Sequence, residues 1–316
     1  MVCILSICGD VKYVIEWRSM KTHHISNGTR AKKSLGQHFL KSEKALRQIV
    51  EAGGITASDT VLEIGPGTGI LTNQLLQKAK HVVAVEKDRE LIHHLTETFK
   101  DEIEEKRLTI LEKDILTFDP MTLQWYGREY KLIANIPYYI TGAIIEQFLS
   151  ASFQPTQMVL LIQKEVAERI IGRDPSSPRL RRAGKKESVL SIAVKAYGVP
   201  KIIDKVPRGA FTPAPKVDSA IISINGISRA FFKDCDEKIF FSVLKSIFGK
   251  KRKQIGGSLA EYLDNPPAPS SGGRAGKSLA LSLLNEATID PKTRPEDLTL
   301  ADWKTLAVAV ERNRVQ

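Results

Sequence analysis

Cysteine is scarce in this chain. Only three of the 316 residues are cysteines, and two of them lie in the N-terminal tail. The adjacent pairs His23-His24 and His93-His94 would point apart on a strand or a helix, so they suit no familiar metal motif. None of the cysteines has the neighbours of a zinc ligand. These scarcities favour a reducing, cytoplasmic setting and a protein without a structural metal. The three cysteines are Cys3, Cys8 and Cys235.

Long hydrophobic runs are also missing. No apolar run approaches the roughly 20 residues that a membrane-spanning helix needs. The stretch from Val2 to Ile7 is apolar but short, and Asp10 and Glu16 interrupt the residues after it, so we expect no signal peptide. Residues 1–30 are therefore expected to be an extension outside the fold, either poorly ordered or upstream of the real start at Met20.

Acidic residues are outnumbered by basic ones. The chain has 47 Lys and Arg against 36 Asp and Glu, a formal net charge of +11 and a pI near 9.4. Such an excess favours a polyanionic partner, with nucleic acid as the leading candidate. Many basic proteins bind no nucleic acid, so the charge alone decides little.

Strand-like and helix-like segments alternate from residue 60 onwards. This alternation predicts a parallel, doubly wound sheet of the Rossmann-like kind. Later in the chain, residues 201–206 and 219–224 are expected to form an antiparallel pair at the sheet edge. The earlier strands are expected at 60–64, 81–85, 108–111, 131–134 and 157–162, and the helices at 43–52, 70–78, 89–106, 141–150, 164–171 and 188–197.

The last part of the chain has a different character. Apolar residues at helical spacing from 239 to 248, and again at 279–287 and 301–311, predict a small helical domain. Residues 264–277, rich in Pro, Gly and Ser, are expected to be a linker. We therefore predict a large α/β domain over 31–226 and a small helical domain over 227–316.

The stretch Asn135-Ile136-Pro137-Tyr138-Tyr139 follows the fourth predicted strand. Chemistry in open α/β sheets collects beyond the carboxyl ends of the strands. The Asn135 amide oxygen and the Ile136 carbonyl are two acceptors suited to an exocyclic amine, and a tyrosine ring is suited to stacking on a base. An ordinary strand-end turn, with the tyrosines in the core, is the alternative for the stretch taken alone.

A glycine-rich loop, Gly65-Pro66-Gly67-Thr68-Gly69, follows the first of these strands and precedes a helix. Its spacing is G-x-G-x-G, not the G-x-G-x-x-G of dinucleotide sites, and Glu63 lies just before it. Glu86 ends the second strand, where a carboxylate accepts from ribose hydroxyls, and Asp114 follows the third, placed for an adenine amine. The alternative interpretation of both acids is that they cap the loops that follow the strands. Four such features at four successive strand ends together predict S-adenosylmethionine as the cofactor.

These motifs resemble those of the rRNA adenine N6,N6-dimethyltransferase family, whose bacterial members modify small-subunit rRNA. The resemblance extends from about residue 31 to residue 310. GQHFL and FTPAPKVDS are more specific than the shared EIGPGTG and NIPYY. The matching stretches are KKSLGQHFL at 32–40, VLEIGPGTGILT at 61–72, VEKD at 85–88, KDIL at 113–116, NIPYYIT at 135–141, QKEVAERI at 163–170, FTPAPKVDSAI at 211–221 and RPEDLTL at 294–300.

The resemblance implies a set of site residues. Its cofactor-binding positions fall on His38, Leu40, Gly65, Glu86, Asp114 and Asn135. Its catalytic, target-base positions fall on Asn135, Pro137 and Tyr138. Tyr139 and Phe211 are expected as further aromatic contacts with the base, although a core position for Phe211 is an equally good interpretation. His38 and Leu40 rest on the resemblance alone.

Two basic segments are candidates for contact with RNA phosphates. One is the loop at 173–186, which includes Arg181 and Arg182, and the other is the run 250–253, which includes Lys251 and Arg252. A solvated surface loop explains the first segment equally well. Lys186-Glu187 replaces the Tyr-Gly pair usual in the family, and the 264–277 linker looks longer than usual, which bears on loop contacts and not on the chemistry.

By this resemblance, the protein transfers methyl groups from S-adenosylmethionine to N6 of two adjacent adenosines near the 3′ end of small-subunit rRNA. The implied partner is a precursor of the small ribosomal subunit, with no membrane, no metal and a monomeric protein. Three alternatives stay open: a large-subunit rRNA adenine methyltransferase of the macrolide-resistance type, a DNA adenine methyltransferase, and a non-catalytic RNA-binding assembly factor. No sequence-reading domain is visible for the second, and loss of Asn135 or its aromatic neighbour would have indicated the third.

Overall fold

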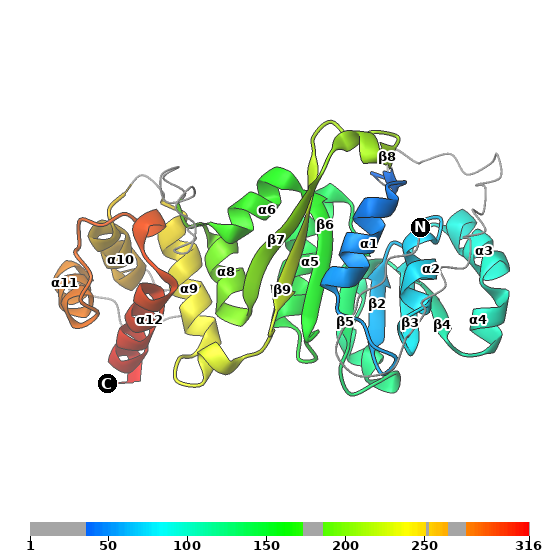
Figure 1. The fold of residues 1–316 in the computed structure, drawn as a ribbon. Helices are drawn as coiled ribbons and strands as arrows, with labels where there is room; N and C mark the ends of the chain where they lie inside the picture. Colours follow the sequence, from blue (N-terminus) through cyan, green and yellow to red (C-terminus); the bar gives the residue numbers. More distant parts are fainter. Residues whose placement is uncertain (1–35, 173–185, 251–252, 265–275, 316) are drawn as a thin grey trace, which may run out of the picture. The chain divides into compact units, whose positions relative to one another are not determined.

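The protein is described by a computed structural model that covers residues 36–172, 186–250, 253–264 and 276–315 (Figure 1). Its centre is a seven-stranded sheet in the order β4-β3-β2-β5-β6-β9-β7. The sheet strands are β2 (Thr60–Ile64), β3 (His81–Glu86), β4 (Leu108–Glu112), β5 (Lys131–Asn135), β6 (Gln157–Gln163), β7 (Val199–Val206) and β9 (Ser219–Asn225).

The sheet is mostly parallel. Strands β4, β3, β2, β5 and β6 pair in parallel, whereas β9 is antiparallel to both β6 and β7. The predicted antiparallel pair is thus confirmed, with β7 at the edge and β9 inside the sheet. Because β2 to β6 are parallel, their carboxyl ends lie along one edge, and the residues just beyond these ends meet there.

Helices cover both faces of the sheet (Figure 1). Alternate residues of one strand pack on opposite faces: Leu62 joins one buried cluster with Ile144 and Phe148, and Val61 joins another with Ile49 and Leu71. Because both faces of the sheet are covered, residues that point to either face are buried, and the strands are apolar almost throughout. The surrounding helices are α1 (Glu43–Ala52), α2 (Ile70–Leu76), α3 (Arg89–Thr98), α4 (Lys100–Glu104), α5 (Thr141–Ser150), α6 (Lys164–Ile171) and α8 (Val189–Tyr197).

The helix predicted over 89–106 is divided in the structure. Phe99 leaves the helical region, with φ −113° and ψ 33°, and separates α3 from α4. Its ring is buried and packs against Gly69, where an added Cβ would lie 2.5 Å from it. The break therefore places an aromatic ring beneath the glycine-rich loop. A helical pattern in sequence cannot show such a long-range contact.

The C-terminal part is helical, as predicted. Its helices are α9 (Glu237–Phe248), α10 (Ile255–Asp264), α11 (Gly276–Glu286) and α12 (Leu300–Val315). They share a buried cluster with Ile192 and Ala196 of α8, and the described residues belong to one compact unit, Ala31–Gln316. A domain boundary between residues 226 and 227 stays a prediction, as does the character of the extension 1–30. Helix α10 was not foreseen.

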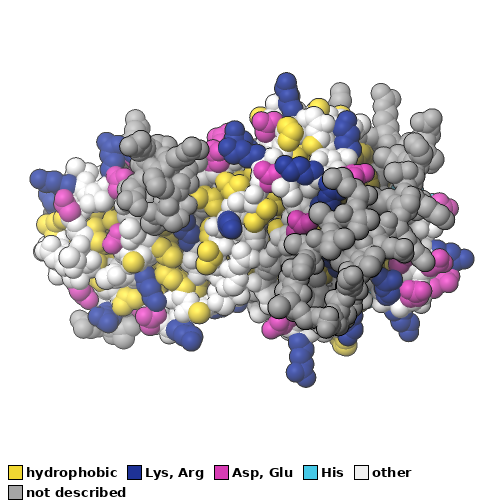
Figure 2. Space-filling model, in the orientation of Figure 1, with side chains coloured by type: hydrophobic (Ala, Val, Ile, Leu, Met, Phe, Trp, Pro, Cys, Tyr) yellow, Lys and Arg dark blue, Asp and Glu magenta, His cyan; other side chains and the backbone are white. Residues whose placement is uncertain are grey.

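Two features are absent from the described residues. No helix there combines the length and the apolar character needed to cross a membrane, and no group of three His, Cys, Asp or Glu side chains there is arranged to hold a metal ion. On the face shown in Figure 2, Lys and Arg side chains are dispersed among Asp and Glu instead of forming one band. The described charges on this face therefore do not by themselves locate an RNA-binding surface.

Candidate active site

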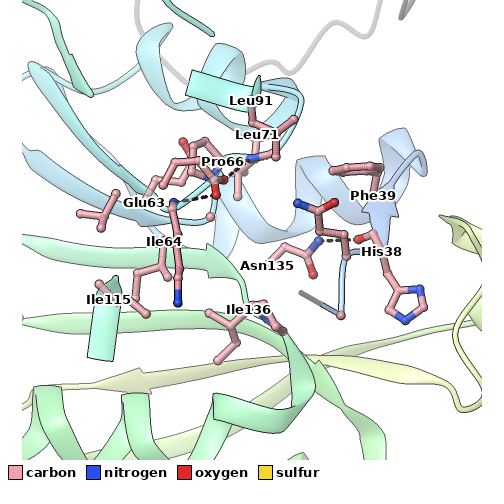
Figure 3. Close-up of a pocket in the computed structure, with 18 of the residues that line it drawn as sticks. His38, Phe39, Glu63, Ile64, Pro66, Leu71, Leu91, Ile115, Asn135 and Ile136 are labelled. Carbon is pink, nitrogen blue, oxygen red and sulfur yellow. Dashed lines mark hydrogen bonds between the residues drawn. The ribbon is translucent and has the colours of Figure 1, made fainter. Parts of the chain in front are cut away.

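A pocket of about 300 Å³ opens at the carboxyl ends of the parallel strands. It brings together the residues just beyond β2, β3, β4 and β5, as the parallel topology predicts (Figure 3). Its lining includes His38, Leu40, Gly65, Glu86, Asp114, Asn135, Pro137, Tyr138 and Tyr139, nine of the residues named from the sequence.

The glycine-rich loop between β2 and α2 forms one wall of the pocket. Gly69 precedes α2 with φ +82°, a conformation that L side chains rarely adopt, and packs on Phe99. Gly65 has φ +63°, and an added Cβ there would meet no atom within 4 Å. The loop thus packs tightly on its inner side and leaves room for a ligand where Gly65 lines the pocket.

Glu86, at the end of β3, is buried in the pocket wall. Its Oε1 accepts hydrogen bonds from the backbone N–H groups of Lys87 (2.8 Å) and Asp88 (2.9 Å), and its Oε2 accepts a longer one from Gly67 (3.4 Å). Burial raises the pKa of the carboxyl, and the three N–H groups oppose that rise. The carboxylate is therefore held in one orientation and keeps acceptor capacity on Oε2.

Asp114, just after β4, is held at the pocket rim. Its Oδ2 accepts from Lys87 Nζ at 2.7 Å, and its Oδ1 caps the next turn by accepting from Leu116 N at 3.0 Å. The hydrogen bond from Lys87 lowers the pKa of the Asp114 carboxyl. The role of Lys87 was not foreseen, although it stands inside the VEKD stretch. It orients the acid proposed for the cofactor's adenine.

Asn135 ends β5, and its amide orientation is set by one contact. Its Nδ2 donates to the His38 carbonyl at 3.2 Å, as Figure 3 shows. The side-chain oxygen is thereby left to accept a hydrogen bond inside the pocket. Ile136 is almost fully buried, and Pro137 comes next with φ −58° and ψ 134°. This backbone is rigid where the second acceptor, the Ile136 carbonyl, was predicted.

The two tyrosines of the site differ in exposure. Tyr138 is half-buried, and its hydroxyl lies 2.6 Å from Ser219 Oγ of β9. Its ring is nearly parallel to the His38 ring, with centroids 6.0 Å apart and an interplanar angle of 23°. Burial raises the pKa of the Tyr138 phenol, so it stays neutral. Tyr139 is 67% exposed at the pocket mouth.

The N-terminal wall of the pocket comes from a contact that the residue patterns did not reveal. Strand β1 (Phe39–Leu40) pairs antiparallel with β8 (Phe211–Thr212), with Leu40 opposite Phe211. His38 Nδ1 also donates to the Pro213 carbonyl at 2.8 Å. Only family resemblance pointed to His38 and Leu40, because two-residue strands carry no periodic signal.

Phe211 occupies a position of its own. It is 2% exposed and packs in the buried cluster that contains Leu40 and Ile221, and it is not among the residues that line the pocket. The core interpretation fits these contacts, and a role as an aromatic wall stays a prediction. Four further candidates, Arg181, Arg182, Lys251 and Arg252, lie outside the described residues.

Glu63 also lines the pocket. In the sequence, its position before the glycine-rich loop served only as evidence against a dinucleotide cofactor. Glu63 is 1% exposed, and its Oε2 accepts from the Thr72 hydroxyl at 2.6 Å. Burial raises the pKa of this carboxyl to about 8, and the nearby charge of Glu86 acts in the same direction. Near neutral pH it is therefore largely protonated.

The chain is similar to a known protein family and to curated relatives. The family model described as ribosomal RNA adenine dimethylase matches residues 28–269. A ribosomal RNA small subunit methyltransferase A of Dehalococcoides mccartyi is 38% identical over 284 residues, which is 90% of each chain. The protein of the same name from Clostridium botulinum is 37% identical over 291 residues, covering 91% of this chain and 98% of the relative.

Solved structures give the same fold. A dimethyladenosine transferase from Plasmodium falciparum is similar with a TM-score of 0.70 and 27% identity, covering 88% of this chain and 98% of that one. The 23S rRNA methyltransferase ErmE is similar with a TM-score of 0.63 and 23% identity, covering 86% and 99%. At that identity the second likeness concerns the fold alone.

Proposed function

Because the chain belongs to the ribosomal RNA adenine dimethylase family, we propose that it dimethylates two adjacent adenosines near the 3′ end of small-subunit rRNA. The methyl donor is S-adenosylmethionine, the acceptor atom is adenosine N6, and the reaction takes place in the cytoplasm during ribosome biogenesis. Relatives that cover nine-tenths of the chain carry the name ribosomal RNA small subunit methyltransferase A.

One observation carries the proposal at the level of chemistry. The Asn135 amide is oriented by the His38 carbonyl so that its oxygen is the group offered to the pocket. An adenine N6 amine has two hydrogens, and an acceptor that holds one of them directs the nitrogen towards the methyl donor. Tyr138, anchored through Ser219, supplies a ring face for the extruded base.

The pocket also fits the cofactor. A purine nucleoside with an amino-acid tail needs a carboxylate for the ribose, an acceptor for the adenine amine and close approach to backbone. Glu86, Asp114 and the open side of Gly65 meet these three needs. When bound, S-adenosylmethionine supplies a methyl group already activated by its sulfonium. The protein's remaining task is placement.

No strong general base is required of the chain. The adenine nitrogen becomes acidic only as it gains the methyl group, and its proton can then leave to water. Two titratable groups of the pocket agree with this: burial keeps Tyr138 neutral, and Glu63 is buried and bonded to Thr72. A second transfer to the same nitrogen requires the monomethylated amine to rotate beneath Asn135.

The small subunit is favoured over the alternatives. The relatives named for the small subunit are 37–38% identical over most of the chain, whereas the likeness to the 23S enzyme ErmE concerns the fold. Asn135, Glu86 and Tyr138 are all present and line one pocket, which argues against a non-catalytic assembly factor.

The test is methyl transfer from radiolabelled S-adenosylmethionine to unmethylated small ribosomal subunits, followed by nucleoside analysis of the rRNA. We expect dimethyladenosine from the wild type and a rate about 100- to 1000-fold lower from Asn135→Ala, as for loss of a preorganised hydrogen-bonding group. Asn285→Ala, at an exposed position in α11, is the matched control and should behave as wild type. Label in large-subunit rRNA would support the resistance-type alternative, and no label in either would refute the proposal.

A further inference from the structure

A second hollow, of about 550 Å³, opens beside the active site. Its lining combines the start of α6 with the segment that leads into β9. The methyl-transfer chemistry proposed above does not use it. We propose that this hollow binds a backbone phosphate of the substrate RNA next to the target adenosine, an inference that rests on the proposed function and extends it. The lining residues are Gln163, Lys164, Glu165, Glu168, Arg208, Lys216, Val217 and Asp218.

The hollow is built onto the support of Tyr138. Asp218 directly precedes Ser219, whose hydroxyl contacts the Tyr138 hydroxyl at 2.6 Å. Gln163 is the cross-strand partner of Ser219, and the backbone N–H of Lys164 donates to the Asp218 carbonyl at 3.0 Å. The two pockets have no lining residue in common, but Tyr138 of the first is linked through Ser219 to Asp218 of the second. This link makes the hollow the place where we expect a phosphate adjacent to the stacked base.

Three cations of the hollow have no carboxylate partner in the part of the chain that the structure describes. Lys164, Arg208 and Lys216 line the hollow, and none of them takes part in an ion pair there. Lys87, by contrast, is paired with Asp114 at 2.7 Å. Unpaired cations around a hollow are suited to an anion that the chain itself does not provide.

The acids of the hollow are engaged in other contacts. Glu165 lies 3.8 Å from Arg169, one turn further along α6. Asp218 Oδ1 accepts from the backbone N–H of Arg208 at 3.0 Å, and Glu168 also has a partner. The hollow therefore holds as many acids as cations, but each acid has a contact of its own, and the three cations keep their donors for a phosphate. The N-terminal end of α6, which receives no side-chain cap from Gln163, adds a partial positive charge.

The test compares two double variants of equal net charge. Lys164→Gln/Lys216→Gln removes two cations of the hollow. Lys78→Gln/Lys80→Gln removes two exposed lysines between α2 and β3, towards the opposite edge of the sheet. For each protein we would measure KM and kcat on unmethylated small subunits over a range of salt concentrations, together with the affinity for S-adenosylhomocysteine.

We expect the hollow variant to raise KM about tenfold, the effect of losing charge-assisted hydrogen bonds, with kcat within about twofold of wild type. Its dependence of log(kcat/KM) on log salt should become shallower by about 0.7 for each phosphate that the variant no longer binds. Unchanged affinity for S-adenosylhomocysteine would show that the fold is intact. The control variant should match wild type.

Three results would overturn the inference. The first is an unchanged KM and salt dependence in the hollow variant, and the second is an equal change in both double variants. The third is a fall in kcat alone, which would assign the lysines to the support of Tyr138. Failure of the proposed function looks different, because the wild type itself would then transfer no methyl group to small subunits.

Discussion

The two halves of the candidate site are built differently. In the cofactor half, Glu86 is buried and accepts three backbone hydrogen bonds, and Asp114 is held from both of its oxygens. In the target-base half, Asn135 is anchored through the His38 carbonyl, Tyr138 is anchored through a serine hydroxyl, and Tyr139 is 67% exposed. The half proposed for the cofactor is therefore preformed for a small ligand. The half proposed for the target base stays more exposed, as binding of a folded RNA requires.

The largest expected effect concerns the rigidity of the cofactor half. Gly69→Ala places a Cβ 2.5 Å from the buried Phe99 ring at φ +82°, so we expect about 3 kcal/mol of destabilisation. Gly54→Ala is the matched control, because its φ is +49° but nothing lies within 4 Å, and it should cost about 1 kcal/mol. Urea unfolding of both variants measures the difference, and equal losses would show that packing beneath the loop contributes little.

The next prediction compares the affinity for S-adenosylmethionine with the affinity for small subunits. Glu86→Gln preserves size, and its oxygen can still accept from Lys87 and Asp88, but its NH₂ then replaces the Oε2 acceptor that faces Gly67 and the ligand. We expect the Kd for S-adenosylmethionine, measured by calorimetry, to rise about 10- to 100-fold. The affinity for small subunits should stay near the wild-type value. A loss of RNA affinity of the same size would mean that the halves are not independent.

A pH effect should mark the buried acid of the cofactor half. Folded Glu63 keeps its proton up to about pH 8, whereas the unfolded chain releases it near the ordinary pKa of 4.5. Between these values the folded state binds more protons, so its stability falls as pH rises, by up to about 1.4 kcal/mol per pH unit. Glu63→Gln cannot ionise and still accepts from Thr72, so it should lose this slope.

The measurement is urea unfolding of wild type and Glu63→Gln at about pH 5.5, 6.5 and 7.5, inside the window between the two pKa values. Taking the difference between the two proteins cancels groups that titrate in both, including Glu86, whose pKa is also raised. Parallel stability curves would show that Glu63 is ionised in the folded protein.

The smallest effect tests what Tyr138 contributes to the base half. Tyr138→Phe keeps the ring and removes only the contact with Ser219, so we expect kcat/KM on small subunits to fall less than about tenfold. Tyr138→Ala removes the stacking surface as well and should cost about 10- to 100-fold more. If both variants lost activity equally, the hydroxyl and not the ring would be the important group.

The sequence predicted the parts of this architecture that have a local pattern. Strands such as β2 and helices such as α5 and α6 lie where they were expected, because buried strands and amphipathic helices leave periodic signals. The cofactor-side acids were predicted from their positions at strand ends. Parallel topology then guarantees that such residues meet at one edge.

The features that could not be predicted depend on contacts between distant residues. The division at Phe99 depends on Gly69, and the pairing of β1 with β8 joins Phe39 to Thr212, from opposite parts of the chain. Lys87 donates a hydrogen bond to Asp114, and Glu63 accepts one from Thr72. A local periodic pattern carries no signal for any of these pairs.

The pairing of β1 with β8 has a consequence for the order of synthesis. His38 and Leu40 are synthesised early. Leu40 pairs with Phe211 and His38 bonds to the Pro213 carbonyl, and both of these partners are synthesised much later. A nascent chain that has emerged only through β5 contains the glycine-rich loop, Glu86, Asp114 and Asn135, yet it lacks both partners. A truncated product that ends before Phe211 therefore lacks both the strand that pairs with β1 and the carbonyl that holds His38.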